Sequence, residues 1–329
     1  MITRRAFSLT ATAAAAALAA PPKSQMGVAT TCYLSYWKPR DADLFLDHCQ
    51  ALGAGGVQSA LPKEPAKFRA RCEQAGMYYE AMLGLSTDAE TMRRQMRMAK
   101  EAGALAGRVG CLSGRRYETF DTLDKWKAFV ADSRTKVALA AKVAGEEKFT
   151  LALENHKDWT LEEMVGLMKE FSGEYFGMLL DTGNNISLLD DPHEFCEQLA
   201  PYATSTHLKD MAWQPHPQGF EMSEMVFGEG QLDMPRIINA IRKARPKTKM
   251  TLEMITRNPL LVTCNTEKFW LTMGGRSGLP LAKTMKMVYT DKPRQPLPRM
   301  DHLDDGQKLR LEDDNVKWCL NVARERYGL

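Results

Sequence analysis

Four residues able to bind a metal ion each close a short apolar or β-branched run. Glu154 ends Leu-Ala-Leu-Glu, Asp181 ends Met-Leu-Leu-Asp, His207 ends Ser-Thr-His and Glu253 ends Met-Thr-Leu-Glu. Runs of this kind predict strands, so each potential ligand stands where a strand ends. The intervals between them are 27, 26 and 46 residues, close to one, one and nearly two strand-plus-helix units. The four side chains are therefore expected to converge at one end of a parallel barrel.

This ligand set predicts a particular chemistry. Carboxylates and an imidazole, without a thiolate, suit one six-coordinate Mn, Mg or Co ion, with Zn as an alternative. Four protein ligands leave about two positions for neighbouring oxygens of a hydroxy-ketone, and such chelation stabilises an enediolate. Glu154 and Glu253 are then expected to remove and return the proton on the carbon beside the carbonyl. A lone glutamate at a strand end is more often solvated or salt-bridged, so the prediction depends on all four residues together.

The elements that must position these residues alternate along the chain. Eight strand patterns with helical patterns between them predict a single (β/α)8 TIM barrel over residues 26–256, and the chain length suits one barrel with extensions. The helix at 88–102 is expected to begin behind Thr87, and Thr160 with Glu163 forms a capping-box pattern. The strands are predicted at 27–35, 56–61, 78–85, 106–112, 149–155, 177–181, 204–208 and 249–255, and the helices at 42–52, 64–75, 88–102, 123–144, 160–173, 192–199 and 235–244.

Two segments depart from the repeat. Residues 212–230 contain Pro215, Pro217 and Gly219, which predict a long loop bordering the site. Residues 257–329 form a C-terminal extension, in which 268–271 is a candidate lid, 290–305 an extended stretch and 315–327 a helix.

The N-terminal segment, residues 1–25, resembles a signal peptide. Arg4 and Arg5 precede an Ala-rich run with small residues suitable for cleavage, which predicts twin-arginine export to the periplasm or the cell exterior. A surface helix or a mitochondrial-type presequence are the alternatives. The run is too short and Ala-rich for a stable membrane span, so no membrane insertion is expected after signal removal.

Composition narrows the class of protein. With 44% hydrophobic and 26% charged residues the chain has the profile of a globular enzyme, and its net charge of +3 argues against nucleic acid or an acidic membrane as partner. The seven cysteines are odd in number and scattered, which predicts buried thiols rather than a disulfide framework. Association into homo-oligomers is compatible with the sequence, but no segment identifies an interface.

Five short motifs resemble the sugar phosphate isomerase/epimerase superfamily, the xylose isomerase-like barrels, over about Met26 to Met273. The resemblance implies that Glu154, Asp181, His207 and Glu253 bind one divalent metal and that the two glutamates transfer protons. The superfamily also includes dehydratases and zinc endonucleases, and its name does not guarantee a phosphorylated substrate. The motifs are Leu153-Glu154-Asn155-His156, Leu180-Asp181-Thr182-Gly183-Asn184-Asn185, His207-Leu208-Lys209-Asp210, Gly228-Glu229-Gly230 and Leu252-Glu253.

Departures from the superfamily pattern help to choose among its members. Only six histidines are present, and only His156 and His207 are expected at strand ends, which argues against a trinuclear zinc site. Asn184 stands where several relatives have histidine; it keeps hydrogen bonding to a hydroxylated substrate but removes an ionisable partner.

Further residues are predicted to contact substrate. They are His156, Asn184, Lys209 and Arg257. Lys209 would place an ammonium near substrate oxygens, although a salt bridge to a neighbouring carboxylate is an equal alternative. Trp37 and Trp213 could form flat walls for a sugar or could be packing residues. Gly228-Glu229-Gly230 is too short to imply phosphate binding and predicts a turn.

Three functions are compatible with these residues. The first is a metal-dependent isomerase or epimerase of a keto sugar or sugar derivative, acting on a small-molecule substrate. The second is a lyase or dehydratase that forms the same enediolate from an oxidised sugar or glycoside. The third is a non-catalytic sugar-binding barrel, which would not require two glutamate bases on opposing faces of a ligand.

Overall fold

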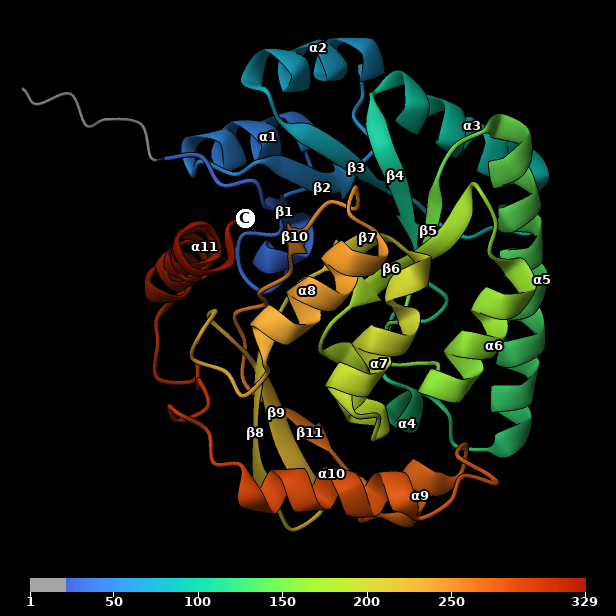
Figure 1. The fold of residues 1–329 in the computed structure, drawn as a ribbon, viewed down its shortest axis with the longest axis vertical. Coiled ribbons are helices and arrows are strands. Elements are labelled where there is room, and N and C mark those ends of the chain that lie inside the picture. Colours follow the sequence, from blue (N-terminus) through green and yellow to red (C-terminus); the bar gives the residue numbers. More distant parts are fainter. Residues whose placement is uncertain (1–21) are drawn as a thin grey trace, which may run out of the picture.

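The computed structural model describes residues 22–329, and the chain in this range forms a closed parallel barrel surrounded by helices (Figure 1). The strands lie in the order β10-β1-β2-β3-β4-β5-β6-β7, and Leu208, just after β7, bridges Leu252 of β10 to close the ring. The predicted TIM barrel is therefore confirmed. Its strands are β1 (Gly27–Ala29), β2 (Gly56–Ala60), β3 (Tyr78–Met82), β4 (Ala104–Val109), β5 (Leu151–Glu154), β6 (Phe176–Asp181), β7 (Ala203–His207) and β10 (Thr251–Leu252).

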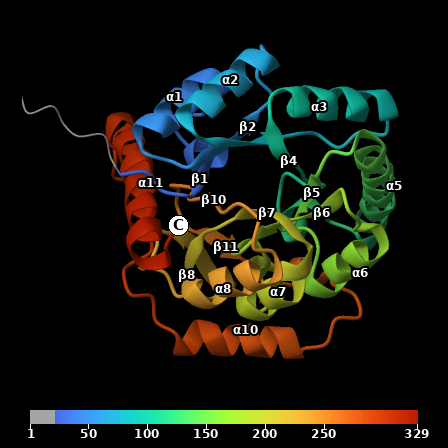
Figure 2. The ribbon, with the colours of Figure 1, turned by 45° about the horizontal axis from the view of Figure 1, so that its top comes forward.

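Helices cover the outside of the barrel and bury the faces that turn toward the strands (Figures 1 and 2). The predicted capping box of Thr160 and Glu163 is present at the start of α6. The start of α3 differs from the prediction, because Asp88 rather than Thr87 caps it by accepting from the Thr91 amide at 2.9 Å. The helices are α1 (Ala42–Ala51), α2 (Pro65–Ala75), α3 (Ala89–Glu101), α4 (Arg116–Thr119), α5 (Leu123–Glu147), α6 (Leu161–Phe171), α7 (Pro192–Leu199) and α8 (Met234–Ala244), with 3-10 turns η1 (Thr30–Tyr33), η2 (Asn184–Leu188) and η3 (Ala200–Tyr202).

The first strand is shorter than predicted. It ends at Ala29, and residues 30–33 turn into η1 instead of continuing as a strand to residue 35. Glu312, from the C-terminal part of the chain, accepts from the backbone amides of Tyr36 and Trp37 at 2.9 Å each and fixes this early departure from the barrel wall. The apolar pattern of 27–35 therefore reflects burial of a turn as well as of a strand.

The predicted loop at 212–230 is wrong. This segment belongs to an antiparallel hairpin, β8 (Asp210–His216) and β9 (Gly219–Met225), to which β11 (Leu260–Val262) adds a third strand. Pro215 and Pro217 are compatible with it because β8 is an edge strand and the turn lies at Pro217 and Gln218. Gly219 is required there, since its φ is 143° and an added Cβ would lie 2.2 Å from the Val262 carbonyl oxygen.

The C-terminal extension wraps the outside of the barrel (Figure 2). The predicted helix at 315–327 begins ten residues earlier, in α11 (Asp305–Tyr327), and the helix α10 (Leu279–Thr290) was not predicted. Residues 291–304 contain no helix or strand, as predicted. The candidate lid coincides with α9 (Glu267–Trp270), where Phe269 is buried against Tyr117 of α4 with ring centroids 5.2 Å apart; its role as a lid stays a prediction.

The structure describes the cysteines and the residues searched for membrane spans, but not most of the predicted signal peptide. All seven cysteines are unpaired thiols, and six of them are buried. No helix among residues 22–329 combines the length and apolarity of a membrane span. The twin-arginine motif and most of the predicted signal peptide lie in residues 1–21, outside the described residues.

Candidate metal centre

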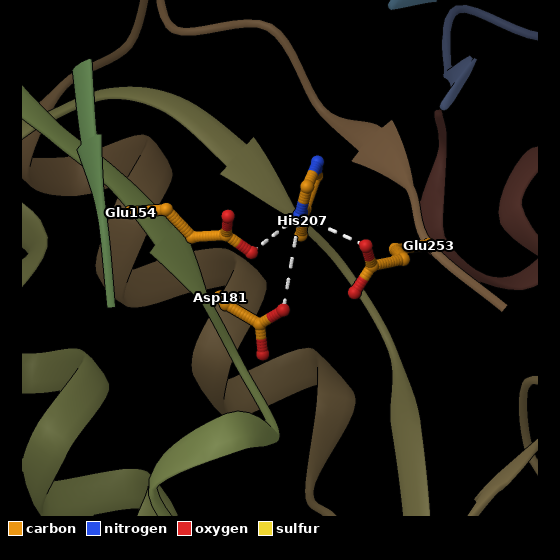
Figure 3. A group of neighbouring side chains, drawn as sticks. All are labelled: Glu154, Asp181, His207 and Glu253. Atoms are coloured by element: carbon orange, nitrogen blue, oxygen red, sulfur yellow. Dashed lines mark ion pairs between the residues drawn. The ribbon is translucent and has the colours of Figure 1, made fainter. Parts of the chain in front are cut away.

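The structure brings Glu154, Asp181, His207 and Glu253 together at the carboxyl ends of neighbouring barrel strands (Figure 3). Glu154 ends β5, Asp181 ends β6 and His207 ends β7, with Asp181 and His207 in direct register. Glu253 follows β10. One ligand atom from each residue lies within 4.8 Å of all the others, and all four side chains are buried. The His207 Nδ1 is 3.3 Å from Glu154 Oε1, 3.4 Å from Glu253 Oε1 and 3.8 Å from Asp181 Oδ2.

The donor atoms of this tetrad fit a metal ion. Glu154 Oε1 and His207 Nδ1 are fully buried atoms without a hydrogen-bond partner in the described part of the chain, and the buried Asp181 Oδ2 has only the Lys209 ammonium, at 2.8 Å. Buried polar atoms are normally satisfied, because an unpaired one costs about 1–3 kcal/mol. Two unpaired atoms and one carboxylate oxygen that meets only an ammonium point at one centre, an arrangement that a divalent cation would satisfy.

Hydrogen bonds from outside the tetrad orient His207. Its Nε2 lies 2.6 Å from the amide oxygen of Gln58, whose own amide nitrogen donates to Glu80 at 3.0 Å. With the Gln58 oxygen as acceptor, Nε2 carries the proton and Nδ1 presents a lone pair to the centre. Burial opposes a charge on His207, but Glu253 and Glu154 raise its pKa above the usual value. The centre therefore attracts positive charge, either as a proton on His207 or as a metal ion.

Asp181 is held by the turn that follows β6. Its Oδ1 accepts from the backbone amides of Gly183 at 2.9 Å and Asn184 at 2.8 Å, which leaves Oδ2 for the centre. The Asn155 side chain pairs with the Asp181 backbone, accepting from its amide at 2.8 Å and donating to its carbonyl at 2.9 Å. The Asp-Thr-Gly-Asn motif thus fixes one ligand in a single orientation.

Two cationic side chains bind the Oε2 atoms of the glutamates, which do not face His207. Arg108 of β4 donates to Glu154 Oε2 at 2.6 Å. Lys209 pairs with Glu253 Oε2 and lies 2.8 Å from Asp181 Oδ2. Burial alone would raise the pKa of both glutamates, but Arg108 and His207 lower that of Glu154, and Lys209 and His207 lower that of Glu253. Both glutamates are therefore held as carboxylates.

A cavity of about 620 Å³ opens beside the tetrad, and its wall includes Glu253. Its volume is within the range of small-molecule sites. Of the residues predicted to contact substrate, His156 and Arg257 line this cavity, whereas Asn184 and Lys209 lie buried beside the tetrad, where the Lys209 Nζ is 3.3 Å from Asn184 Oδ1. The salt-bridge alternative for Lys209 is the one that the geometry supports.

The other predicted features are structural. Trp213 is 1% exposed in the core, and Trp37 packs on Tyr33 with ring centroids 5.0 Å apart; neither lines the cavity. The Gly228-Glu229-Gly230 segment is a turn around Asp210, whose carboxylate accepts from the amides of Gly228 and Gly230 at 3.0 Å each.

Four site residues were not predicted from the sequence. Arg108 was the easiest of them to predict, because a lone arginine inside the apolar strand 106–112 needs a partner. Lys157 lies one residue beyond His156 and is 4% exposed on the cavity wall. The four are Gln58, Arg108, Lys157 and Glu224.

Comparison with known proteins agrees with this site. The family described as the xylose isomerase-like TIM barrel matches residues 46–271. The chain belongs to this family. Curated proteins similar to it include the uncharacterised protein YihM of Escherichia coli, 28% identical over 154 residues, and the 3-oxo-isoapionate decarboxylase of Pectobacterium atrosepticum, 24% identical over 235 residues. The alignments cover 46% and 66% of this chain, and 46% and 81% of those proteins, so the chain matches under half the length of YihM.

Solved structures share the xylose isomerase-like fold with this chain. A D-psicose 3-epimerase from Clostridium cellulolyticum, solved with D-tagatose, aligns with a TM-score of 0.53 at 15% identity and covers 80% of this chain and 96% of the epimerase. A xylose isomerase-like barrel from Mycobacterium smegmatis, solved with magnesium, aligns with a TM-score of 0.54 at 14% identity, with 80% and 98% coverage. The chain therefore shares its fold with a sugar epimerase, is similar in sequence to a decarboxylase, and carries a buried tetrad of metal-ligand type.

Proposed function

We propose that this protein is a divalent-metal-dependent isomerase or epimerase of a keto sugar or sugar derivative. One observation carries the proposal: Glu154, Asp181, His207 and Glu253 direct buried ligand atoms at one centre, those of Glu154 and His207 without a hydrogen-bond partner among the described residues, beside a cavity of sugar size. The magnesium in a family structure and the epimerase among the similar folds support it.

A divalent cation held by the four residues would polarise a substrate carbonyl and stabilise negative charge on its oxygen. Glu154 and Glu253 reach the centre from opposite sides (Figure 3). One carboxylate would take the proton from the carbon beside the carbonyl, the C–H electron pair would become the C=C bond of the enediolate, and the C=O π pair would move onto the oxygen. The other glutamate, which must first take a proton from solvent, would then return a proton to the second face. Return to the same carbon is epimerisation, and return to the neighbouring carbon is isomerisation.

A second candidate is a lyase that acts on an oxidised sugar. Arg108 and Lys209 bind the outer oxygens of the two glutamates and lower their pKa values, which weakens them as bases. In an elimination, the proton is lost first and a β-substituent then leaves with its bonding electron pair. In a decarboxylation, carbon dioxide leaves in place of the proton, so that no strong base is needed. One curated relative is a decarboxylase, which supports this candidate.

Solvent-deuterium exchange separates the candidates. Mature protein, loaded with Mn or Mg, is incubated in D2O with unphosphorylated keto sugars and 3-keto glycosides, and the products are followed by NMR. Label at the carbon beside the carbonyl together with an isomeric product supports the isomerase or epimerase. Loss of a substituent supports the lyase. If the protein binds sugar but shows neither exchange nor turnover, the result supports the non-catalytic sugar-binding barrel.

Variants locate the activity. Glu154→Gln and Glu253→Gln should lose more than about 99% of the exchange rate, while Glu73→Gln, at a glutamate whose side chain is 65% exposed, should leave it unchanged. Metal content is measured for each variant, because loss of a ligand and loss of a base are otherwise indistinguishable. Full exchange by a metal-loaded Glu253→Gln protein would remove that residue from the proposed mechanism.

We also propose export by the twin-arginine route, on the basis of Arg4, Arg5 and the Ala-rich run that follows. The double variant Arg4→Lys, Arg5→Lys should keep the protein in the cytoplasmic fraction, whereas the wild type should be found processed in the periplasm or the medium. Equal fractionation of the two would reject this route.

A further inference from the structure

Lys157 is a buried ammonium on the cavity wall without a carboxylate partner. The residue is 4% exposed, and no carboxylate oxygen of residues 22–329 lies within 4.0 Å of its Nζ. Its polar contact is the neutral amide oxygen of Asn184. A buried charge usually has a counter-ion, because desolvation is costly without one.

Other cationic side chains surround Lys157 and increase its need for a counter-ion. Burial and, after it, repulsion by Lys209 and Arg257 lower the pKa of Lys157 to about 8, against the attraction of Glu224 and Asp181. Lys209 is neutralised by the tetrad carboxylates and Arg257 by Glu224, but Lys157 has no such pair. A divalent cation on the tetrad would add positive charge to the same side of the cavity.

Arg257 presents unused donors on the same wall. Its side chain is 24% exposed and lines the cavity, while Nε and Nη2 bond to Glu224. A guanidinium carries five N–H donors, so the Nη1 donors are free of the Glu224 contact. His156, on the same wall, has a buried Nδ1 without a partner among the described residues. This wall thus offers charge and hydrogen bonds to a ligand.

We infer that the cavity binds a substrate with an anionic group, which Lys157 and Arg257 hold, so that the substrate is an acidic sugar derivative rather than a neutral sugar. This inference rests on the proposed function for the identity of the site, and it names the substrate class. A carboxylate or a phosphate supplies the same chemistry to an ammonium and a guanidinium. The recognition residues lie outside the tetrad, so their effect is on affinity and not on metal binding.

Binding to the Mn-loaded protein tests the inference by calorimetry. The probes are D-fructose as the neutral sugar, 5-keto-D-gluconate as the carboxylate and D-fructose 6-phosphate as the phosphate. At least one acidic probe should bind about 10-fold more tightly than D-fructose and lose affinity with added KCl. The tighter acid identifies the anionic group. Equal or weaker binding of both acids, with Mn bound, overturns the inference.

Variants assign the anion to Lys157. Lys157→Met keeps the length of the side chain without its charge, and it should raise the dissociation constant of the acidic probe about 10-fold or more while that of D-fructose is unchanged. Lys142→Met, at a lysine whose side chain is 73% exposed, is the matched control. An unchanged dissociation constant in folded Lys157→Met overturns the assignment. If Lys157→Met does not fold, the inference is tested by the wild type alone, through its preference for acidic probes over D-fructose and the loss of that preference with added KCl.

Failure of this inference and failure of the proposed function give different results. A protein that binds acids selectively but neither exchanges deuterium nor turns them over keeps the inference and loses the enzymatic proposal. A protein that exchanges deuterium into neutral keto sugars and binds acids no better keeps the enzymatic proposal and loses the inference.

Discussion

Replacement of Gln58 by methionine tests how the barrel prepares His207 for a metal. Gln58 lies in β2, is 0% exposed and accepts from His207 Nε2 at 2.6 Å. Methionine fills a similar volume but cannot accept this hydrogen bond effectively. The imidazole proton is then free to move to Nδ1, which lies 3.3 Å from the Glu154 carboxylate, and a metal ion must displace it there.

The expected loss follows from these contacts. Removal of a partner that orients a metal-binding histidine lowers metal affinity about 10–100-fold, equivalent to about 1.4–2.7 kcal/mol. The free energy of unfolding should fall by about 1–3 kcal/mol, because His207 Nε2 is left buried without an acceptor. Glu80 loses its bond from Gln58 but keeps one from Thr251 Oγ1 at 3.0 Å, so this side of the network contributes less.

Calorimetric titration of Mn into metal-free protein measures the effect. The wild type is compared with Gln58→Met and with the exposed control Gln198→Met, whose amide contacts only Glu194 at 3.1 Å. Gln58→Glu should retain most of the affinity, because a carboxylate also accepts from Nε2, provided that it shares a proton with Glu80, whose pKa is already raised by burial and which lies 3.0 Å from the Gln58 amide nitrogen. If folded Gln58→Met binds Mn within twofold of the wild type, the argument that Gln58 sets the tautomer of His207 is refuted.

Three further predictions concern stability. Arg116→Met should cost about 2–4 kcal/mol in urea unfolding, because it leaves the Thr272 and Asp158 carbonyls without their bonds of 2.6 and 3.0 Å; a loss no larger than that of the exposed Arg134→Met would contradict this. Burial raises the pKa of Asp158 to about 7, so its contribution to stability is present at low pH and is lost as pH rises from about 4 to 7. Asp158→Asn should therefore gain stability relative to the wild type by up to about 1.4 kcal/mol per pH unit in that window, and parallel pH profiles would reject it. Chelation should lower the melting temperature, and Mn at 100 times its dissociation constant should restore about 2.7 kcal/mol, about 4 °C for a chain of this length, whereas an unchanged melting temperature would contradict a metal site.

The barrel and its tetrad could be predicted from the sequence for a physical reason. Parallel strands that are buried on both faces read as apolar runs, and a polar ligand at the end of such a run is conspicuous. Because the carboxyl ends of all strands in a barrel meet, the side chains of Glu154, Asp181, His207 and Glu253 had to come together once eight strands were assigned.

The hairpin β8–β9 was missed because its local signals compete. Pro215, Pro217 and Gly219 are typical of loops, but β8 and β9 pair with each other across the turn, and β11, which begins 35 residues after β9 ends, adds the third strand. Tertiary pairing thus decided the structure against local propensity.

Gln58 and Arg108, which lie in strands, were missed for a different reason. Whether a polar side chain in a strand faces the barrel interior depends on the register with its neighbours, and sequence alone does not fix that register. Gln58 reaches a residue 149 positions later, and Arg108 one 46 positions later. The first contact joins β2 to β7, which are not neighbours in the sheet, so it exists only after the ring has closed, and the second requires the pairing of β4 with β5.

A crystal grown with Mn²⁺ and measured at the manganese absorption edge tests the central claim most directly. The account predicts one strong anomalous peak per chain, bounded by Glu154 Oε1, Asp181 Oδ2, His207 Nδ1 and a carboxylate oxygen of Glu253, and its loss in Asp181→Asn. Full occupancy elsewhere in the protein, or no peak at the tetrad at a saturating Mn²⁺ concentration, would contradict it.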